Sequence, residues 1–283
     1  MIVNSKFSSL YLGCKNEWKV PFDQDVCFIQ KYAADEELRI QFTGNEQNYY
    51  AKYISCSGVE TNLAVQLLYT DPVTGYGTFE IFFSISEIGI YCFEISNGTE
   101  KVVSYFKIAD DVELENTILL RYTHRKNEYE SIFINSDNSK KYFSFRIDGG
   151  IFPSGKSQAI DNNFFRDQRF TLHQISAQAY EISVLTIGST KGVPQWVGNR
   201  INHIFSLSDI SIDGIETKRN EGSTVEIVEL SKYYPLFVFK LNVEQSDEEK
   251  ITLGEEDDGG GTVIPPDPES GDFNNDFNND FNS

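Results

Sequence analysis

The segments Ile210-Ser-Ile-Asp-Gly-Ile215 and Tyr234-Pro-Leu-Phe-Val-Phe-Lys-Leu-Asn-Val243 carry the clearest structural pattern of the chain. The first alternates apolar and polar residues into Asp213-Gly214, a dipeptide typical of a two-residue β-hairpin turn. The second also alternates along its length, which predicts a long closing strand. Upstream, Leu185-Thr-Ile-Gly188 is followed by a loop that contains glycine and proline. We therefore expect one folded unit between Leu185 and Glu244.

A short helix is predicted inside this unit, over residues 195–207. Its apolar residues recur at i, i+4, i+7 and i+8, the spacing of one helical stripe. They are Val197, Ile201, Ile204 and Phe205. Pro194 stands at the start, where a missing N–H costs nothing because first-turn amides have no helical partner. The unit is therefore expected to belong to the α+β class.

Residues 7–108 predict a β-sandwich, because about eight short runs of strand-forming residues alternate with turn signals. The clearest runs are Val26–Gln30, Leu38–Thr43, Tyr49–Ser55, Leu63–Tyr69, Thr78–Ser84, Gly89–Ser96 and Val102–Ile108. The pattern Gly89-x-Tyr91-x-Phe93-x-Ile95 resembles the strand of immunoglobulin-like sandwiches that begins with a tyrosine corner. Cys92 is out of phase with the disulfide position of those domains. We therefore expect an Ig-like sandwich without the disulfide.

The chain as a whole is predicted to be mainly β, with two β-rich domains and a tail. The polar run Asp110-Asp-Val-Glu-Leu-Glu-Asn116 marks a boundary. It divides an Ig-like sandwich over residues 1–112 from an α+β domain with one short helix over residues 113–250. Further strands of the second domain are expected at Ile118–Tyr122, Glu130–Ile134, Tyr142–Ile147 and Tyr180–Ile187. Residues 251–283 have the composition of an extended acidic tail, which cannot build a core.

The charge balance argues against nucleic acid as a partner. The formal net charge is −19, from 43 acidic and 24 basic residues. Residues 251–283 hold nine acids and no base, so the remaining 34 acids and 24 bases leave −10 on the body. Phosphate backbones are bound through Lys and Arg, and both parts of the chain would repel them.

The cysteine pattern bears on the redox compartment of the protein, and the apolar runs bear on whether it enters a membrane. Cys14, Cys27, Cys56 and Cys92 form no Cys-x-x-Cys pair and no dense disulfide framework, which suits a reducing compartment or buried thiols. The amino-terminal residues lack the apolar run of a signal peptide, and no segment approaches membrane-spanning length. We expect no membrane insertion.

One segment matches the phosphate-binding P-loop expression letter for letter. It reads Gly150-Ile-Phe-Pro-Ser-Gly-Lys-Ser157. A true P-loop joins a parallel strand to a helix, whereas Gln158–Phe165 shows no helical stripe. Pro153 also removes one N–H from the proposed phosphate cradle. We interpret this segment as a turn between strands.

No other pattern predicts catalysis, a cofactor or a metal ion. His124, His173 and His203 are scattered and have no metal-ligand spacing. No nucleophile elbow and no Cys–His pairing is present. We therefore expect a protein that is not an enzyme. The better candidate for function is the repeat Asp-Phe-Asn-Asn at the carboxyl end, whose Phe273, Phe277 and Phe281 offer apolar anchors to a partner.

The second domain resembles virion structural proteins encoded by phages and prophages of Bacteroidetes, including crAss-like phages. The resemblance rests on Gly188–Ser206, Phe164-Phe-Arg-Asp-Gln-Arg-Phe170, Ile212-Asp-Gly214, Glu221-Gly-Ser-Thr224 and Tyr234-Pro-Leu-Phe237. It implies a tail-associated part such as a ring, hub, collar or baseplate, which is made in the host cytoplasm and located in the virion. No catalytic residue is implied.

The resulting hypothesis is a structural subunit of a phage tail. Copies would assemble in a closed ring by heterologous contacts and would also touch other tail or portal-proximal proteins. The helix with Pro194 and Trp196, together with the tail phenylalanines, would supply parts of these contacts. The alternatives are a tail-tip module that binds a receptor or glycan through exposed aromatics, and an acidic-tailed single-strand DNA-binding protein. The second alternative needs a basic groove, which a body charge of −10 disfavours.

Overall fold

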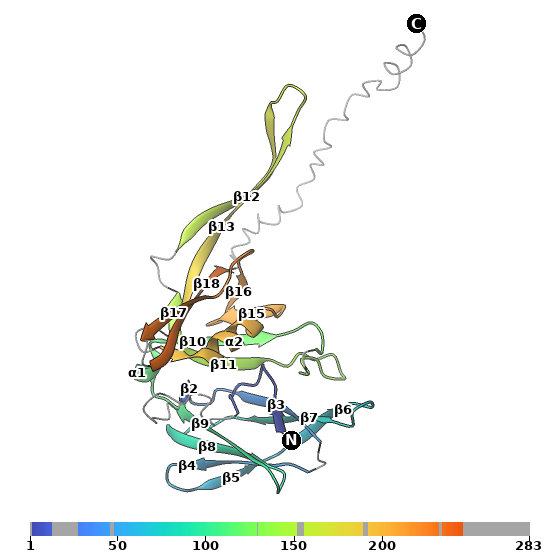
Figure 1. Cartoon of the computed structure of the whole chain (residues 1–283), viewed down its shortest axis with the longest axis vertical. Helices are drawn as coiled ribbons and strands as arrows, with labels where there is room; N and C mark the ends of the chain where they lie inside the picture. Colours follow the sequence, from blue (N-terminus) through green and yellow to red (C-terminus); the bar gives the residue numbers. More distant parts are fainter. Residues whose placement is uncertain are drawn as a thin grey trace, which may run out of the picture. The chain divides into compact units, whose positions relative to one another are not determined.

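The computed structural model describes residues 2–12, 28–45, 48–128, 130–151, 156–188, 192–231 and 234–245. Residues 1–246 form one compact unit, and the acidic tail lies outside the described residues. The described chain is mainly β, as predicted, and contains two helices (Figure 1).

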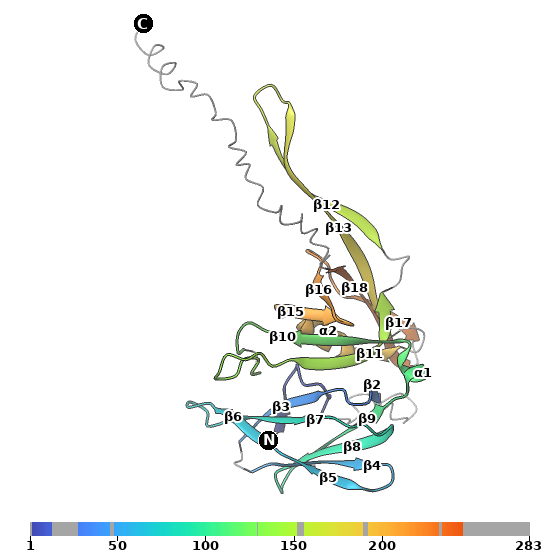
Figure 2. The same ribbon diagram turned by 180° about the vertical axis from the view of Figure 1, so that it is seen from behind.

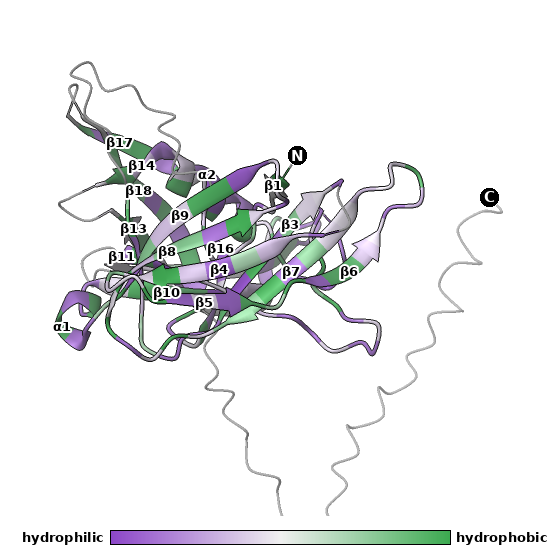
Figure 3. Cartoon of the chain, turned by 90° about the horizontal axis from the view of Figure 1, so that it is seen from below, coloured by the Kyte–Doolittle hydropathy of each residue, from purple (hydrophilic) through white to green (hydrophobic). Residues whose placement is uncertain are grey.

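The first half of the unit is a β-sandwich of two sheets around one core. One sheet has the order β1 (Ile2–Asn4), β3 (Leu38–Gly44), β7 (Gly77–Phe83) and β6 (Gln66–Thr70). The other has the order β2 (Gln30–Tyr32), β9 (Lys101–Ile108), β8 (Gly89–Ser96), β4 (Tyr50–Ser55) and β5 (Glu60–Leu63). Both apolar and polar residues occur along β8 and β9 (Figure 3), and successive side chains point to opposite faces of a sheet. The inward set of β8 is Tyr91, Phe93 and Ile95, all buried.

Tyr91 makes a side-chain hydrogen bond near the start of β8. The hydroxyl of Tyr91 donates to the carbonyl oxygen of Glu87 at 2.8 Å, four residues upstream. The predicted strand Leu63–Tyr69 is wrong as a single element. β5 ends at Leu63 in one sheet, and β6 begins at Gln66 in the other, because the chain crosses between the two sheets there.

The predicted strand Glu130–Ile134 is also wrong. Among its described residues there are only isolated bridges, one of Ser131 with Glu128 and one of Ile134 with Lys140. The side chain of Asn127 accepts hydrogen bonds from the backbone N–H groups of Phe133 and Ile134, each at 2.8 Å. A side chain therefore satisfies donors that a neighbouring strand would otherwise bind.

The second half is an antiparallel sheet that closes on itself. Its strands are β10 (Thr117–Thr123), β11 (Phe143–Ile151), β12 (Ser157–Arg166), β13 (Leu172–Ile187), β14 (Val193–Pro194), β15 (Asp209–Ile212), β16 (Ile215–Arg219), β17 (Glu226–Ser231) and β18 (Tyr234–Gln245). The order is β12-β13-β11-β10-β15-β16-β18-β14, with β17 beside β18 and a further pairing of β13 with β18. Six strands, β13, β11, β10, β15, β16 and β18, thus pair in a closed circle. Such closure leaves no open edge within the circle.

The hairpin and helix predictions are confirmed. Asp213 and Gly214 join β15 to β16 with φ of 50° and 88°, as a type I′ turn requires. α2 (Gln195–Ile204) buries Val197, Ile201 and Ile204. A Cβ on Gly198 would lie 2.2 Å from the ring of Phe239, so glycine lets α2 approach β18 closely. The polar run at the predicted domain boundary contains a further short helix, α1 (Asp111–Leu114), whose first turn is capped by Asp110.

The amino-terminal segment Ser5–Leu12 connects the two cores. Phe7 is buried among residues of the second half, whereas Leu10 and Leu12 belong to the core of the sandwich. The carbonyl oxygen of Ser9 accepts from Gln30 Nε2 at 3.1 Å and from Arg200 Nη1 at 3.4 Å, which join the sandwich and α2. One segment is therefore part of both halves.

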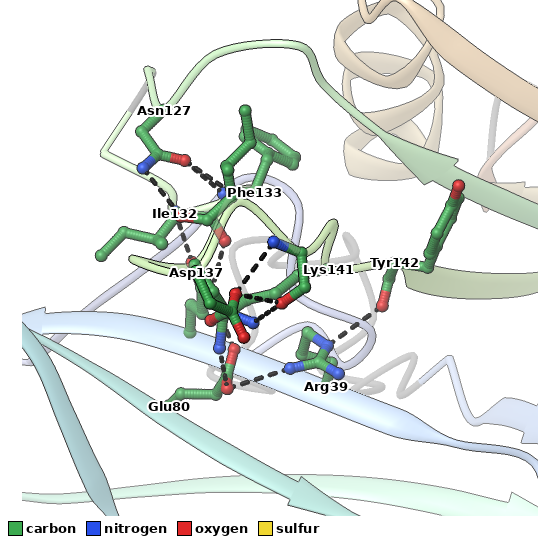
Figure 4. A network of polar contacts seen from close by, with 12 residues as sticks. Arg39, Glu80, Asn127, Ile132, Phe133, Asp137, Lys141 and Tyr142 are labelled. Atoms are coloured by element: carbon green, nitrogen blue, oxygen red, sulfur yellow. Dashed lines mark hydrogen bonds and ion pairs between the residues drawn. The ribbon is translucent and has the colours of Figure 1, made fainter.

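A buried polar network also joins the halves (Figure 4). Glu80 of β7 accepts from Gln41 at 2.9 Å, pairs with Arg39 at 2.9 Å, and pairs with Lys141 at 2.5 Å. Lys141 lies two residues before β11 of the second half. Burial opposes ionisation of Glu80, but the hydrogen bonds from Lys141 and Gln41 and the charge of Arg39 outweigh it, and the pKa of Glu80 is lowered. Residues 1–246 cluster as one unit by their contacts. The domain boundary at residue 112 stays a prediction.

Candidate interaction surface

A long hairpin carries several exposed apolar side chains, and we call this hairpin, residues 157–182, the hairpin arm. β12 and β13 pair from Ser157 with Ile182 to Arg166 with Leu172, with one irregularity beside Phe164. Beyond Ile182, β13 joins β18 and β11 in the closed circle. The two opposite views agree that the arm runs away from the rest of the sheet (Figures 1 and 2).

Asp167 organises the turn at the end of the arm. Its carboxylate accepts from the backbone N–H groups of Arg169 and Thr171, each at 2.8 Å, and lies 3.1 Å from His173 Nε2. The hydrogen bond from His173, followed by that from the Thr171 N–H, lowers the pKa of Asp167. Phe170 adopts φ of 63°, which is uncommon for an aromatic residue. The turn thus holds an aromatic side chain at the tip.

Large apolar side chains of the arm are exposed along its length. Phe170 is 78% and Ile175 66% exposed. The others are Ile160, Phe164, Phe165 and Leu172. Single exposed apolar residues are ordinary on protein surfaces, whereas this one hairpin carries six of them. The arm therefore has the chemistry of a surface that another molecule covers.

Two of the predicted partner-binding residues, Pro194 and Trp196, are engaged within the chain. Pro194 is buried, pairs with Leu236 and caps α2. Trp196 is half-buried and stacks on Tyr11 with ring centroids 4.3 Å apart. Their role toward a partner stays a prediction. Phe273, Phe277 and Phe281 lie outside the described residues.

Trp196 belongs to a cluster of aromatic rings around Arg200. The guanidinium of this buried residue lies 5.1 Å from the ring of Phe145, 5.5 Å from that of Trp196 and 5.9 Å from that of Tyr11. Burial lowers the pKa of Arg200. Within the described residues no carboxylate forms an ion pair with it, so aromatic faces and the Ser9 carbonyl oxygen stabilise its charge. This cluster fixes α2 rather than offering a site.

The P-loop lookalike joins two strands. Gly150 and Ile151 end β11, and Ser157 begins β12, so no helix follows the motif. The Nζ of Lys156 forms an ion pair with Oε1 of Glu181 on β13 at 2.5 Å. Residues 152–155 lie outside the described residues. The strand on either side agrees with the interpretation of this segment as a connection between strands.

The three histidines lie in separate places and have separate partners. His124 contacts Glu128 at 2.5 Å, His173 contacts Asp167 at 3.1 Å, and His203 contacts the carbonyl oxygen of Asn199 at 2.6 Å. In the described part of the chain, no three His, Cys, Asp or Glu side chains gather as metal ligands would. Nor does any helix described there have the length and apolar character needed to span a membrane.

The sequence pattern did not identify the arm, although it identified Phe164–Phe170 as a distinctive segment. The available signal was that Leu172–Ile187 contains no proline or glycine, which lets one strand extend beyond the predicted Tyr180–Ile187. No protein-family model matches the chain, and no curated protein matches its sequence.

Proposed function

We propose that this protein is a structural subunit of a phage tail, which assembles with copies of itself and with neighbouring tail proteins in a ring, hub, collar or baseplate. The observation that carries the proposal is the hairpin arm, whose six large exposed apolar side chains need a covering surface. The segment Ser5–Leu12 contributes to the cores of both halves and so joins them, which suits a subunit that bears mechanical load. The resemblance of most of residues 118–244 to virion structural proteins supports a location in the phage tail. The protein would be made in the host cytoplasm and located in the virion.

The proposal includes the finer features of the fold. The sandwich is of the Ig-like type, as the bond from Tyr91 to Glu87 supports. Residues 251–283 act as an extended acidic tail whose phenylalanines reach neighbouring proteins. Neither part requires a cofactor, and the protein acts through contacts rather than by catalysis.

Electron microscopy of the purified full-length chain tests this proposal, together with a mass-spectrometric census of purified phage particles. We expect closed rings in the micrographs and the chain among the particle proteins. A chain that is absent from particles and remains a monomer in solution would contradict it.

A second candidate, a tail-tip module that binds glycans, draws on a different observation. Several tyrosines outside the arm are exposed, including Tyr50 on β4 and Tyr69 on β6. Tyrosine offers an apolar face and a polar tip, the combination that sugar rings require. A glycan array separates the two functions, because a ring subunit is expected to give no specific signal.

A further inference from the structure

The hairpin arm has two open edges. Over Leu172–Glu181, β13 pairs with β12 alone among the described residues. The outer edge of β12, Ser157–Arg166, likewise faces no described strand. A two-stranded hairpin without a core is marginally stable in water. The backbone groups along both edges are therefore able to pair with further strands.

The other edge strands of the described chain are shorter than the β13 edge or carry charged residues. Proteins protect open edges by short length, bulges, charge or proline. β1 and β2 have three residues each and β5 has four. β6 has a register shift beside Leu67, and β17 carries Glu226 and Glu229.

The β13 edge, by contrast, is uncharged from Leu172 to Tyr180. Leu172-His-Gln-Ile-Ser-Ala-Gln-Ala-Tyr180 contains no Asp, Glu, Lys, Arg, Pro or Gly over nine residues. One bulge, where Ile175 has no opposite residue on β12, interrupts it. Uncharged strand segments without proline or glycine are those that pair readily between chains.

The charge of the chain favours a second copy as the partner of these edges. Residues 157–182 contain two Arg, two Asp and one Glu, a net charge of −1, so the rest of the chain carries −18 of the total −19. Per residue the arm carries about the same charge as the rest of residues 1–250, but Leu172–Tyr180 carries none, so two copies place little like charge against each other where these edges meet. The 26 residues of the arm, from 157 to 182, also match the roughly 20–30 residues that each side contributes to a standard interface.

Geometry then selects which edges meet. In a cyclic ring whose arms lie along the ring axis, all arms point the same way, so β12 of one copy runs antiparallel to β13 of the next. Antiparallel is the pairing that already joins these two strands within one arm. A two-fold contact between identical edges would instead require arms that point in opposite directions.

We infer that the arms of neighbouring copies pair edge to edge, β12 of one copy with β13 of the next, in a closed antiparallel barrel with two strands per copy. This inference rests on the proposed ring function and deepens it by naming the surface that closes the ring. The exposed apolar side chains of each arm would then pack against those of its neighbours.

Lysine substitutions on the β13 edge test the inference in the full-length chain. The variant Leu172→Lys/Ile175→Lys places charge on exposed positions of this edge. Its matched control is Leu67→Lys/Tyr69→Lys, on exposed positions of the edge strand β6. We expect mass photometry to show assemblies for the wild-type chain and the control, and the 32.2 kDa monomer for the arm variant. Circular dichroism should show the same β content in all three.

Hydrogen exchange distinguishes edge pairing from other contacts of the arm. Amides that form strand pairs between copies exchange slowly, so residues 172–181 of the assembled wild-type chain should exchange at least about tenfold more slowly than in the monomeric variant. Equal exchange in assembly and monomer would overturn the inference, as would rings that survive the arm substitutions. Both results leave the ring function standing. A wild-type chain that forms only two-fold dimers would overturn the inference, and a chain that stays monomeric and is absent from particles would overturn both.

Discussion

The Nζ of Lys141 lies 2.5 Å from Oε2 of Glu80, and both side chains are almost fully buried between the two halves of the molecule. Lys141→Met is expected to lower the free energy of unfolding by about 3–5 kcal/mol, because it leaves a buried carboxylate without its nearest cation. The neighbouring Lys140, whose pair with Asp209 is exposed, provides the matched control. Lys140→Met should cost at most about 1 kcal/mol. Urea denaturation measures both, and equal losses would contradict a special role for the buried pair.

The same network predicts how stability depends on pH. The pKa of Glu80 is lowered in the folded chain relative to its ordinary value of 4.5, since its partners outweigh the effect of burial. A carboxyl with a lowered folded pKa stabilises the fold above its unfolded pKa, and this contribution is lost as pH falls through the folded pKa.

The difference in unfolding free energy between the wild type and Glu80→Gln should therefore be constant at neutral pH and shrink as pH falls below 4.5. Chemical denaturation at a series of pH values measures it. The exposed Glu229→Gln, outside the network, is the control for the loss of a surface carboxylate. If the difference in unfolding free energy between the wild type and Glu80→Gln grew as the pH fell, it would contradict a lowered pKa of Glu80 in the folded chain.

Gly198→Ala is expected to loosen the contact of α2 with β18. The added methyl group would meet the ring of Phe239 at 2.2 Å, far inside a normal contact. Overpacking of this kind costs about 1–3 kcal/mol, in spite of the better helix propensity of alanine. Thermal unfolding should show the loss, and Phe239→Leu in the same chain should recover part of it. Gly150→Ala, where nothing lies within 4 Å, is the control. A stabilised Gly198→Ala variant would show that the helix has room to move.

Phe170→Asn separates assembly from stability. Asparagine accepts the φ of 63° found at this position, and the side chain of Phe170 is 78% exposed. The unfolding free energy should change by no more than about 0.5 kcal/mol, as is usual for surface positions. Association measured by sedimentation should weaken. Val73→Asn, at a 90% exposed apolar position on another hairpin, should leave association unchanged. Loss of association in both variants would point to a general effect of surface hydrophobicity.

Local patterns were sufficient to predict the elements that local chemistry determines. The turn at Asp213-Gly214 requires φ values that glycine and aspartate accept, and the stripe of Val197, Ile201 and Ile204 has the period of a helix. The strand predicted at Glu130–Ile134 failed because the side chain of Asn127, which is close in sequence, satisfies the backbone there. Leu63–Tyr69 failed since one apolar run serves two sheets.

Pairings between distant residues could not be predicted from the sequence. The ion pair of Glu80 with Lys141 spans 61 residues, and the pairing of β13 with β18 depends on how the whole sheet closes. The hairpin arm was missed for a different reason. Its apolar residues are of the same types as buried strand residues, and the sequence does not reveal that the rest of the described chain leaves them uncovered.

The position of Phe7 has a consequence for how the chain is made. Its ring is buried against Tyr122 and Phe133, at centroid distances of 6.4 Å and 5.4 Å, within a core completed by residues as late as Val243. Phe7 leaves the ribosome long before these neighbours are synthesised, so its side chain cannot be buried until the carboxyl-terminal strands are present. Folding during synthesis thus cannot finish with the sandwich alone, and a chain interrupted after residue 112 would leave its own beginning without a place to pack.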